Sequence, residues 1–207
     1  MIPVKRLSTA KSRLRGVVPA ARHADLALAM VRDTAAAVLA GSAVGELVVV
    51  TDDPVATAAV TALGARVVPD RPNAGLNAAI RFGADEVAGV ARHRAVFAGD
   101  LPALRPEQVD AALAAATHRS FVPDATGTGT VLLAAPPGHR LEPHFGPGSA
   151  SAHARSGAAS LVGDWPGLRR DVDTPADLRT VLDLGAGRYT WSLLHDLGLA
   201  PGRAPAA

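Results

Sequence analysis

The sequence AVFAGDLP, residues 95–102, holds four apolar residues followed by a glycine, the carboxylate of Asp100, a leucine and a proline. A short apolar run that stops at a glycine is typical of a buried strand, and a proline soon after it favours a turn. Ligands of open α/β sheets gather outside the carboxyl ends of the strands. Asp100 is therefore a candidate functional residue, although an Asp that only opens a turn is the simpler explanation while Asp100 is considered alone.

Other apolar runs of this kind occur at residues 2–4, 46–51, 65–68 and 130–134. Helical patterns separate them, because apolar residues recur at helical spacing at positions 28, 31, 35 and 38 and again at 109, 113 and 116. Thr174, Pro175 and Asp177 together have the sequence of a capped helix start. The alternation predicts an α/β fold in which helices flank a largely parallel sheet.

A chain of 207 residues with 48% hydrophobic side chains predicts one globular domain, over residues 1–201. Residues 202–207 have nothing to pack against and are expected to be disordered. The first apolar run leaves only residues 2–4 before Lys5, whereas a central strand usually has about five or six residues. Either the true start of the chain lies upstream, or the first strand is short and the sheet compensates.

The composition argues against several classes of function. A formal net charge of +2 and an aromatic content of 3% do not suggest a nucleic-acid-binding protein. The chain has no cysteine, which excludes disulfides and thiolate metal sites. It also lacks an apolar run of about 18 residues and a signal peptide, so we expect a soluble, cytoplasmic protein with no membrane partner.

Lysine is rare in this chain: of the 21 basic residues only Lys5 and Lys11 are lysines, and both lie in IPVKRLSTAKSRL, residues 2–14. An ammonium is a compact charge on a flexible stem, suited to a phosphate group that moves during a reaction. The segment is not a P-loop, because GxxxxGK[ST] is absent. The two lysines either face a polyphosphate or belong to a solvated basic segment, and composition alone does not separate the two.

A second group of acids, Asp171 and Asp173, precedes the capped helix start at Thr174. Mg²⁺ takes oxygen ligands and usually binds one or two protein carboxylates together with phosphate oxygens of the substrate. One of these acids is expected to complete a magnesium site with Asp100, and the other to pair with Arg169 or Arg170. Asp173 is the preferred ligand because it stands closest to the strand end.

Two turns rich in glycine and hydroxyl residues, DATGTGT at 124–130 and FGPGSASAH at 145–153, have the composition of a site that holds a small anion through backbone amides and a helix N-terminus. They are equally compatible with simple turns.

His144 and His153 match no zinc spacing, and no GxSxG motif supports acyl-enzyme chemistry. Asn77, in NAGLN at 73–77, either belongs to a turn that opens a helix or touches a base or ribose.

Taken in order, these segments resemble the guanylyltransferases of coenzyme F-420 (deazaflavin) biosynthesis, which act on 2-phospho-L-lactate or phosphoenolpyruvate. The resemblance runs from Ile2 to about Arg188, and its carriers are PVKRLSTAKSRL, NAGLNAAI, AGDLPAL, DATGTGT, FGPGSASAH and DVDTPADL. It implies a single-domain nucleotidyltransferase fold of the GT-A type with a mixed sheet. It also implies transfer of GMP from GTP to a small phosphorylated three-carbon acid, with release of pyrophosphate, and a downstream enzyme that passes the product to a deazaflavin.

The resemblance assigns roles to individual residues. Phosphoenolpyruvate is the implied acceptor, because the richness in Ala and Arg is similar to that of actinobacterial members. The implied contacts are Thr130, Gly146 and Ser149 for the acceptor, Asp100 and Asp173 for Mg²⁺, and Lys5, Lys11, Arg13 and Asn77 for the nucleotide, with both lysines facing the triphosphate. Two other hypotheses remain: a nucleotidyltransferase of the same fold with a sugar phosphate or molybdopterin acceptor, and a non-catalytic nucleotide-binding relative. The oligomeric state is not indicated.

Overall fold

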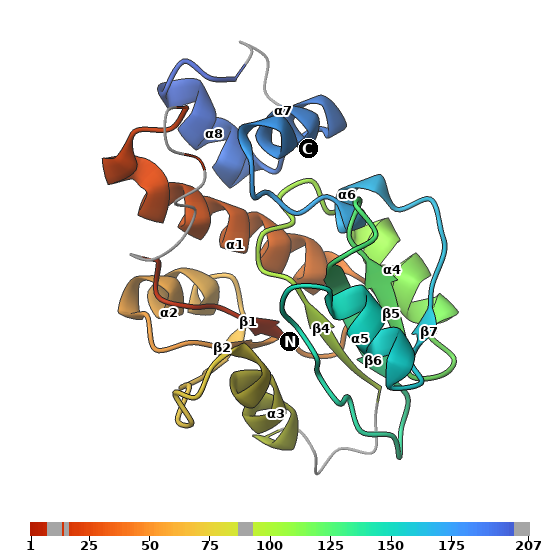
Figure 1. Ribbon diagram of the computed structural model, residues 1–207. Coiled ribbons are helices and arrows are strands. Elements are labelled where there is room, and N and C mark those ends of the chain that lie inside the picture. The colour runs from red at the N-terminus through yellow and green to blue at the C-terminus, as the bar shows by residue number, and fades with distance from the viewer. Residues whose placement is uncertain (8–13, 15–16, 87–92, 201–207) are drawn as a thin grey trace.

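A computed structural model of the chain describes residues 1–7, 14, 17–86 and 93–200 (Figure 1). Lys11, Arg13 and the tail expected to be disordered lie outside the described residues. The strands are β1 (Ile2–Pro3), β2 (Val48–Val50), β3 (Arg66–Val68), β4 (Arg94–Phe97), β5 (Ser120–Pro123), β6 (Thr130–Ala135) and β7 (Ala159–Ser160). The helices are the 3-10 turn η3 (Ala20–Arg22), α1 (His23–Ala40), α2 (Pro54–Thr61), α3 (Leu76–Glu86), α4 (Pro106–Ala115), α5 (Ser149–Arg155), α6 (Pro166–Arg169), α7 (Pro175–Leu184) and α8 (Arg188–Asp196).

The sheet is mixed. Strands β1, β2 and β3 pair in parallel in the order β1-β2-β3, and β4, β6, β5 and β7 pair in the order β4-β6-β5-β7. A backbone hydrogen bond of 2.9 Å from the Phe97 amide to the Met1 carbonyl joins β4 to the β1 side. Because β6 runs antiparallel to both β4 and β5, the largely parallel pairing expected from the sequence pattern is interrupted there, and the sheet is mixed, as the resemblance implies. The predicted α/β class, with helices flanking the sheet, is confirmed.

The short first strand is compensated by its neighbours. Although β1 has two residues, the Val4 amide continues its pairing by donating to the Val50 carbonyl at 2.9 Å. Ile2, one of its two residues, is fully buried, with β2 paired on one side and β4 bonded to Met1 on the other. Burial on both faces is what an apolar central strand requires.

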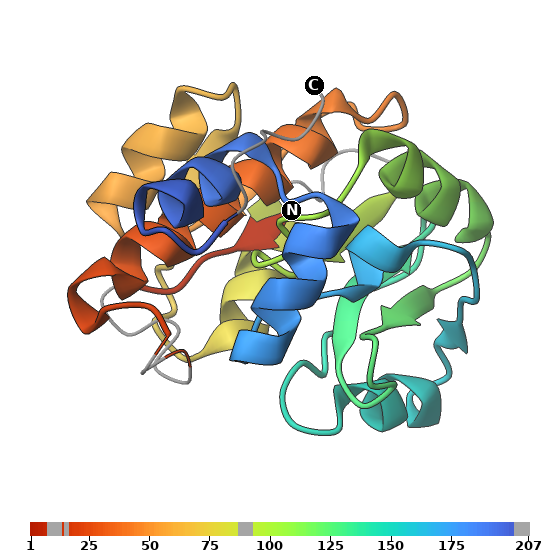
Figure 2. The ribbon, with the colours of Figure 1, turned by 90° about the horizontal axis from the view of Figure 1, so that it is seen from above.

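Helix α1 packs on two layers at once, which places it between the sheet and the C-terminal helices (Figure 1). Val31, Ala35 and Val38 belong to the same buried cluster as the strand residues. Leu26 and Met30 pack instead in a second cluster with residues of α7 and α8. Figure 2 shows α8 from above, lying against α1. Within the described part of the chain, no helix has both the length and the apolar character needed to cross a membrane.

Two neighbouring polar residues on α1 are buried and make specific hydrogen bonds. The Asp33 carboxylate accepts the amides of Tyr189 at 3.0 Å and Thr190 at 2.7 Å, the second and third residues of α8. Asp33 thus acts as the N-terminal cap of a helix far along the chain. The Thr34 hydroxyl accepts the Leu101 amide at 3.0 Å, directly after Asp100. Helix α1 therefore holds both the C-terminal helices and the turn that carries Asp100.

Replacing Asp33 with Ala should lower the free energy of unfolding by about 1–3 kcal/mol, because two amides of α8 lose their acceptor in a buried place. Chemical denaturation of Asp33→Ala measures this loss. The control is Asp25→Ala on the same helix, which removes an exposed ion pair with Arg22 and should cost about 0–1 kcal/mol. Equal losses in the two variants would show that Asp33 does not hold α8.

Candidate active site

The described candidate residues gather along one edge of the sheet. Asp100 follows the carboxyl end of β4, and Lys5 follows that of β1, where its side chain is exposed. The β4–β6 register pairs Phe97 with Leu132, which brings Thr130, at the start of β6, opposite the turn before Asp100. This convergence is the geometry expected of a ligand site in an open α/β sheet.

The segment that carries Asp171 and Asp173 lies against the end of β4. The Val172 amide, between the two acids, donates to the Asp100 carbonyl at 3.2 Å. Burial, together with the negative charges of Asp100, Asp173 and Asp124, raises the pKa of Asp171 to about 7. Three carboxylates are therefore close enough to Asp171 to disfavour its charged form, and this crowding favours either a bound proton or a bound cation.

Arg169 and Arg170 come directly before Asp171 in the chain, and each has a partner in the structure. Arg170 pairs with Asp177 at 3.2 Å, and Arg169 donates to the backbone carbonyls of Pro123 and Asp124. Asp171 is half-buried, whereas Asp173 is exposed. The pair with Asp177 was not expected, and pairing of Asp171 or Asp173 with Arg169 or Arg170 stays a prediction.

The carboxylates at the end of β4 fit a hard divalent cation, because they offer oxygen ligands and excess negative charge. Within the described ranges, no three His, Cys, Asp or Glu side chains form a group that could hold a metal by themselves. A cation here would thus be held by one or two carboxylates, with the remaining ligands from water and substrate. That arrangement is the usual one for Mg²⁺ with phosphate substrates.

Asp124 was not predicted as a functional residue, and it organises the first glycine-rich turn from within. Its carboxylate accepts the Thr128 amide at 3.0 Å and the Gly129 amide at 2.9 Å. A side chain at Gly129 would place its Cβ 2.5 Å from the Asp124 Oδ2, so any other residue there would displace this carboxylate from the amides that it accepts. Of the two interpretations of this turn, these bonds favour the simple turn for the Thr128 and Gly129 amides, because Asp124 already accepts both of them.

The second glycine-rich turn lies directly before α5 and sets the backbone conformation that leads into this helix. Gly146 and Gly148 have φ values of 141° and 70°, which favour glycine. The Ser149 amide donates back to the Gly146 carbonyl at 3.1 Å, and the Ala150 amide donates to the Thr128 carbonyl at 3.1 Å. The second bond joins the two turns, so Thr130 and Ser149 are held on adjoining segments.

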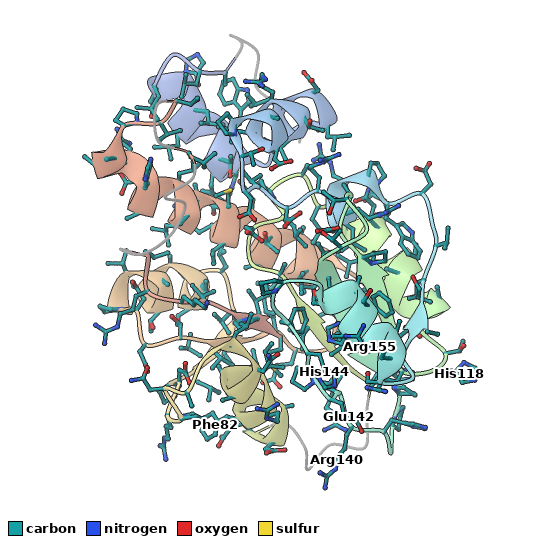
Figure 3. All side chains as sticks on the ribbon, viewed as in Figure 1. Phe82, His118, Arg140, Glu142, His144 and Arg155 are labelled. Carbon is teal, nitrogen blue, oxygen red and sulfur yellow. The ribbon has the colours of Figure 1, made fainter. Side chains whose placement is uncertain are left out.

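Asn77, at the start of α3, ties this loop to the β1-β2-β3 side. Its amide oxygen accepts the Phe145 amide at 2.8 Å, and its Nδ2 donates to the Phe145 carbonyl at 2.9 Å. Figure 3 shows the loop that leads into this contact, with Arg140, Glu142 and His144 labelled along it. The side chain thus holds the backbone next to Gly146 in place.

His153, on α5, is fully buried beside the candidate acceptor residues. Its Nδ1 lies 3.0 Å from the Thr130 hydroxyl, and its Nε2 accepts the His144 amide at 3.0 Å. Both ring nitrogens are therefore engaged within the protein, which agrees with the sequence argument against a His144–His153 metal pair. Sequence reasoning did not find this role, because a residue 23 positions from Thr130 carries no local signal of the contact.

Solved structures establish the fold independently. The chain is similar to a putative nucleotide-diphospho-sugar transferase from Desulfovibrio desulfuricans, with a TM-score of 0.69 at 18% identity over 96% of this chain and 94% of that one. It is also similar to a nucleotidyl transferase from Methanothermobacter, with a TM-score of 0.55 at 20% identity over 88% of this chain and 96% of that one. At these identities the likeness supports the nucleotidyltransferase fold alone.

Curated relatives are much closer in sequence. A phosphoenolpyruvate guanylyltransferase of Salinispora arenicola is 55% identical over 99% of this chain and 96% of its own length. A protein of the same name from Geodermatophilus obscurus is 54% identical over 94% of this chain and 92% of its own length. The model of the family described as "Guanylyl transferase CofC like" matches residues 1–205. With a match over nearly its whole length, this chain belongs to the CofC-like guanylyl transferase family.

Proposed function

We propose that this protein transfers GMP from GTP to phosphoenolpyruvate, giving enolpyruvyl-diphospho-guanosine and pyrophosphate in coenzyme F-420 biosynthesis. In this reaction a phosphate oxygen of the acceptor bonds to the α-phosphorus of GTP, and the bond from that phosphorus to the bridging oxygen of pyrophosphate breaks. The observation that carries the proposal is the 55% identity, over 99% of the chain, with a relative named for this activity. The convergence of the candidate residues at one sheet edge supports it.

The inventory of side chains suits this chemistry. A phosphate monoester has a second pKa of about 6, so the attacking group is already largely ionised at neutral pH and requires no general base. The difficulty lies in bringing two anions together in line. A bound Mg²⁺ would neutralise charge on the phosphate oxygens and stabilise the transition state. Asp100 and Asp173 are the proposed residues for holding it, with the half-buried Asp171 beside them.

The acceptor is proposed to lie where the two glycine turns adjoin. The Thr130 and Ser149 hydroxyls would donate to its carboxylate or phosphate, and the backbone at Gly146 would complete the site. Lys5, from the end of β1, would face the triphosphate, as would Lys11 and Arg13. Asn77, which the resemblance implies for the nucleotide, already bonds through its amide oxygen and one N–H to the Phe145 backbone, so its proposed part is to hold the loop next to Gly146.

Acceptor choice should favour phosphoenolpyruvate over 2-phospho-L-lactate by roughly 10–200-fold in kcat/KM, by analogy with other discriminations based on shape. The two acids carry the same anionic groups and differ in the planarity of the central carbon. The test offers both acids together with GTP and counts the two guanylylated products by mass. A majority of lactyl product would overturn the choice of acceptor while leaving the family assignment intact.

Replacing Asp100 with Asn should lower kcat roughly hundredfold or more at saturating GTP, because the amide weakens a cation site worth several kcal/mol in the transition state. The fold should persist, as judged by circular dichroism. Asp183→Asn, at an exposed position of α7, serves as the control and should keep full activity. Full activity of Asp100→Asn at limiting Mg²⁺ would contradict the metal assignment, and damage confined to Asp171→Asn would show that Asp173 is the wrong ligand.

A further inference from the structure

His153 connects the parts of the proposed acceptor site. It lies four residues after Ser149 on α5, so both residues face the same side of the helix. The His153 ring also meets the Phe145 ring edge-on, with 5.1 Å between centroids. Through its two nitrogens it touches the Thr130 hydroxyl and the backbone of His144, two residues before Gly146.

The direction of each hydrogen bond around His153 follows from the chemistry of its partners. The His144 amide is a backbone N–H and can only donate, so Nε2 of His153 must present its lone pair. The ring proton of the neutral imidazole therefore resides on Nδ1. The Nδ1–H faces the Thr130 oxygen at 3.0 Å, and the ring also bonds to the Ser149 backbone, so a protonated Nδ1 can only donate to the Thr130 hydroxyl and cannot accept from it. As a result the hydroxyl proton of Thr130 is directed away from His153 and is available to another acceptor.

The neutral state of the ring is favoured by its surroundings. Burial, together with the nearby charges of His144 and Arg119, lowers the pKa of His153 to about 4, although a hydrogen bond to the Ser149 backbone opposes the shift. A protonated ring would also set a second N–H against the His144 amide. The ring therefore keeps one donor and one acceptor across the physiological pH range.

We propose that His153 is a positioning residue of the acceptor site, which fixes the Thr130 hydroxyl as a donor toward an anionic oxygen of the substrate and holds the loop around Gly146 in place through the His144 amide. This inference rests on the proposed function, because it takes Thr130 and Gly146 as acceptor contacts. The class of group recognised is a carboxylate or phosphate oxygen, which can only accept a hydrogen bond. Asn77 holds the next peptide of the same loop, so two side chains from opposite sides fix it.

The first test is the tautomer itself, read from the imidazole nitrogen resonances of ¹⁵N-labelled protein. The inference requires the proton on Nδ1 and a bare Nε2 at neutral pH. A proton on Nε2 would overturn it. This readout does not depend on activity or on the identity of the acceptor.

The second test compares three replacements of His153. His153→Asn offers an amide N–H near the place of Nδ1, and His153→Gln offers an oxygen near the place of Nε2. His153→Phe offers neither group. The Phe variant should raise the KM for phosphoenolpyruvate roughly tenfold to hundredfold, as expected when a hydrogen bond to a charged group is lost, and should leave the KM for GTP within about twofold. The Asn variant should recover more of the acceptor affinity than the Gln variant.

The matched control is His23→Phe, which removes another buried histidine, bonded through Nε2 to the Val18 carbonyl at 3.0 Å. It should lower the melting temperature without changing the KM for either substrate. A His153→Phe enzyme whose KM values follow the control would overturn the inference. The same holds if the GTP and acceptor KM values of that enzyme rise together.

A double variant separates positioning from general damage. In a Thr130→Val background, His153→Phe should add little to the loss in acceptor KM, because the hydroxyl that His153 directs is already absent. Fully additive losses would contradict the inference. If wild-type enzyme guanylylates a different acid, the proposed function fails, and the same KM comparison is then made with that acid. If wild type uses phosphoenolpyruvate while the variants behave like the control, only the inference fails.

Discussion

The backbone hydrogen bond from the Val172 amide to the Asp100 carbonyl sets the electrostatics of the site. It brings Asp171 and Asp173 against the turn after β4 that carries Asp100, and burial together with the charges of Asp100, Asp173 and Asp124 raises the pKa of Asp171 to about 7. A fold keeps such crowding where a cation offsets it. The site is therefore adapted to bring further anions in, provided that a positive charge comes with them.

The acceptor side is arranged differently, since it relies on neutral donors rather than on charge. Thr130, Ser149 and the Gly146 loop belong to separate segments, and the buried His153 joins the first of them to the last. Asn77 then ties the loop to α3, across the join between the two groups of strands. Neutral donors of fixed direction distinguish substrates by shape and hydrogen bonding, whereas the proposed part of the carboxylates and lysines is to act on the phosphates common to all nucleotides.

Many helices and strands could be predicted from local patterns, but the order and direction in which the strands pair could not. Helices α1, α4 and α7 and most strands follow from apolar spacing and caps, and Thr174 makes the expected capping box with Asp177. Strand β5 was missed because its apolar run is brief and ends in Pro123. The antiparallel course of β6 depends on which strand it joins, and no local signal in residues 130–135 encodes that choice.

In the candidate site, too, the residues with local sequence signals could be predicted, whereas the tertiary contacts could not. A carboxylate after a strand and acids before a cap are local features, so Asp100, Asp171 and Asp173 could be found in sequence. The carboxylate of Asp124 consumes the amides of its own turn, and His153 directs a hydroxyl 23 residues away; both are tertiary contacts. The glycine and hydroxyl content of the first turn therefore suggested more free backbone amides than the turn has. The same composition gave no sign of the contact that His153 on α5 makes with Thr130.

The central claim is that the chain positions two anions so that the acceptor's own phosphate attacks the α-phosphorus of GTP. Phosphoenolpyruvate with ¹⁸O in its phosphate group tests this most directly, with the products read by ³¹P magnetic resonance. The account predicts an isotope shift on the guanosine α-phosphorus from a labelled bridging oxygen, with unlabelled pyrophosphate. An α-phosphorus without the shift, as attack by the carboxylate would give, or label in pyrophosphate would contradict it.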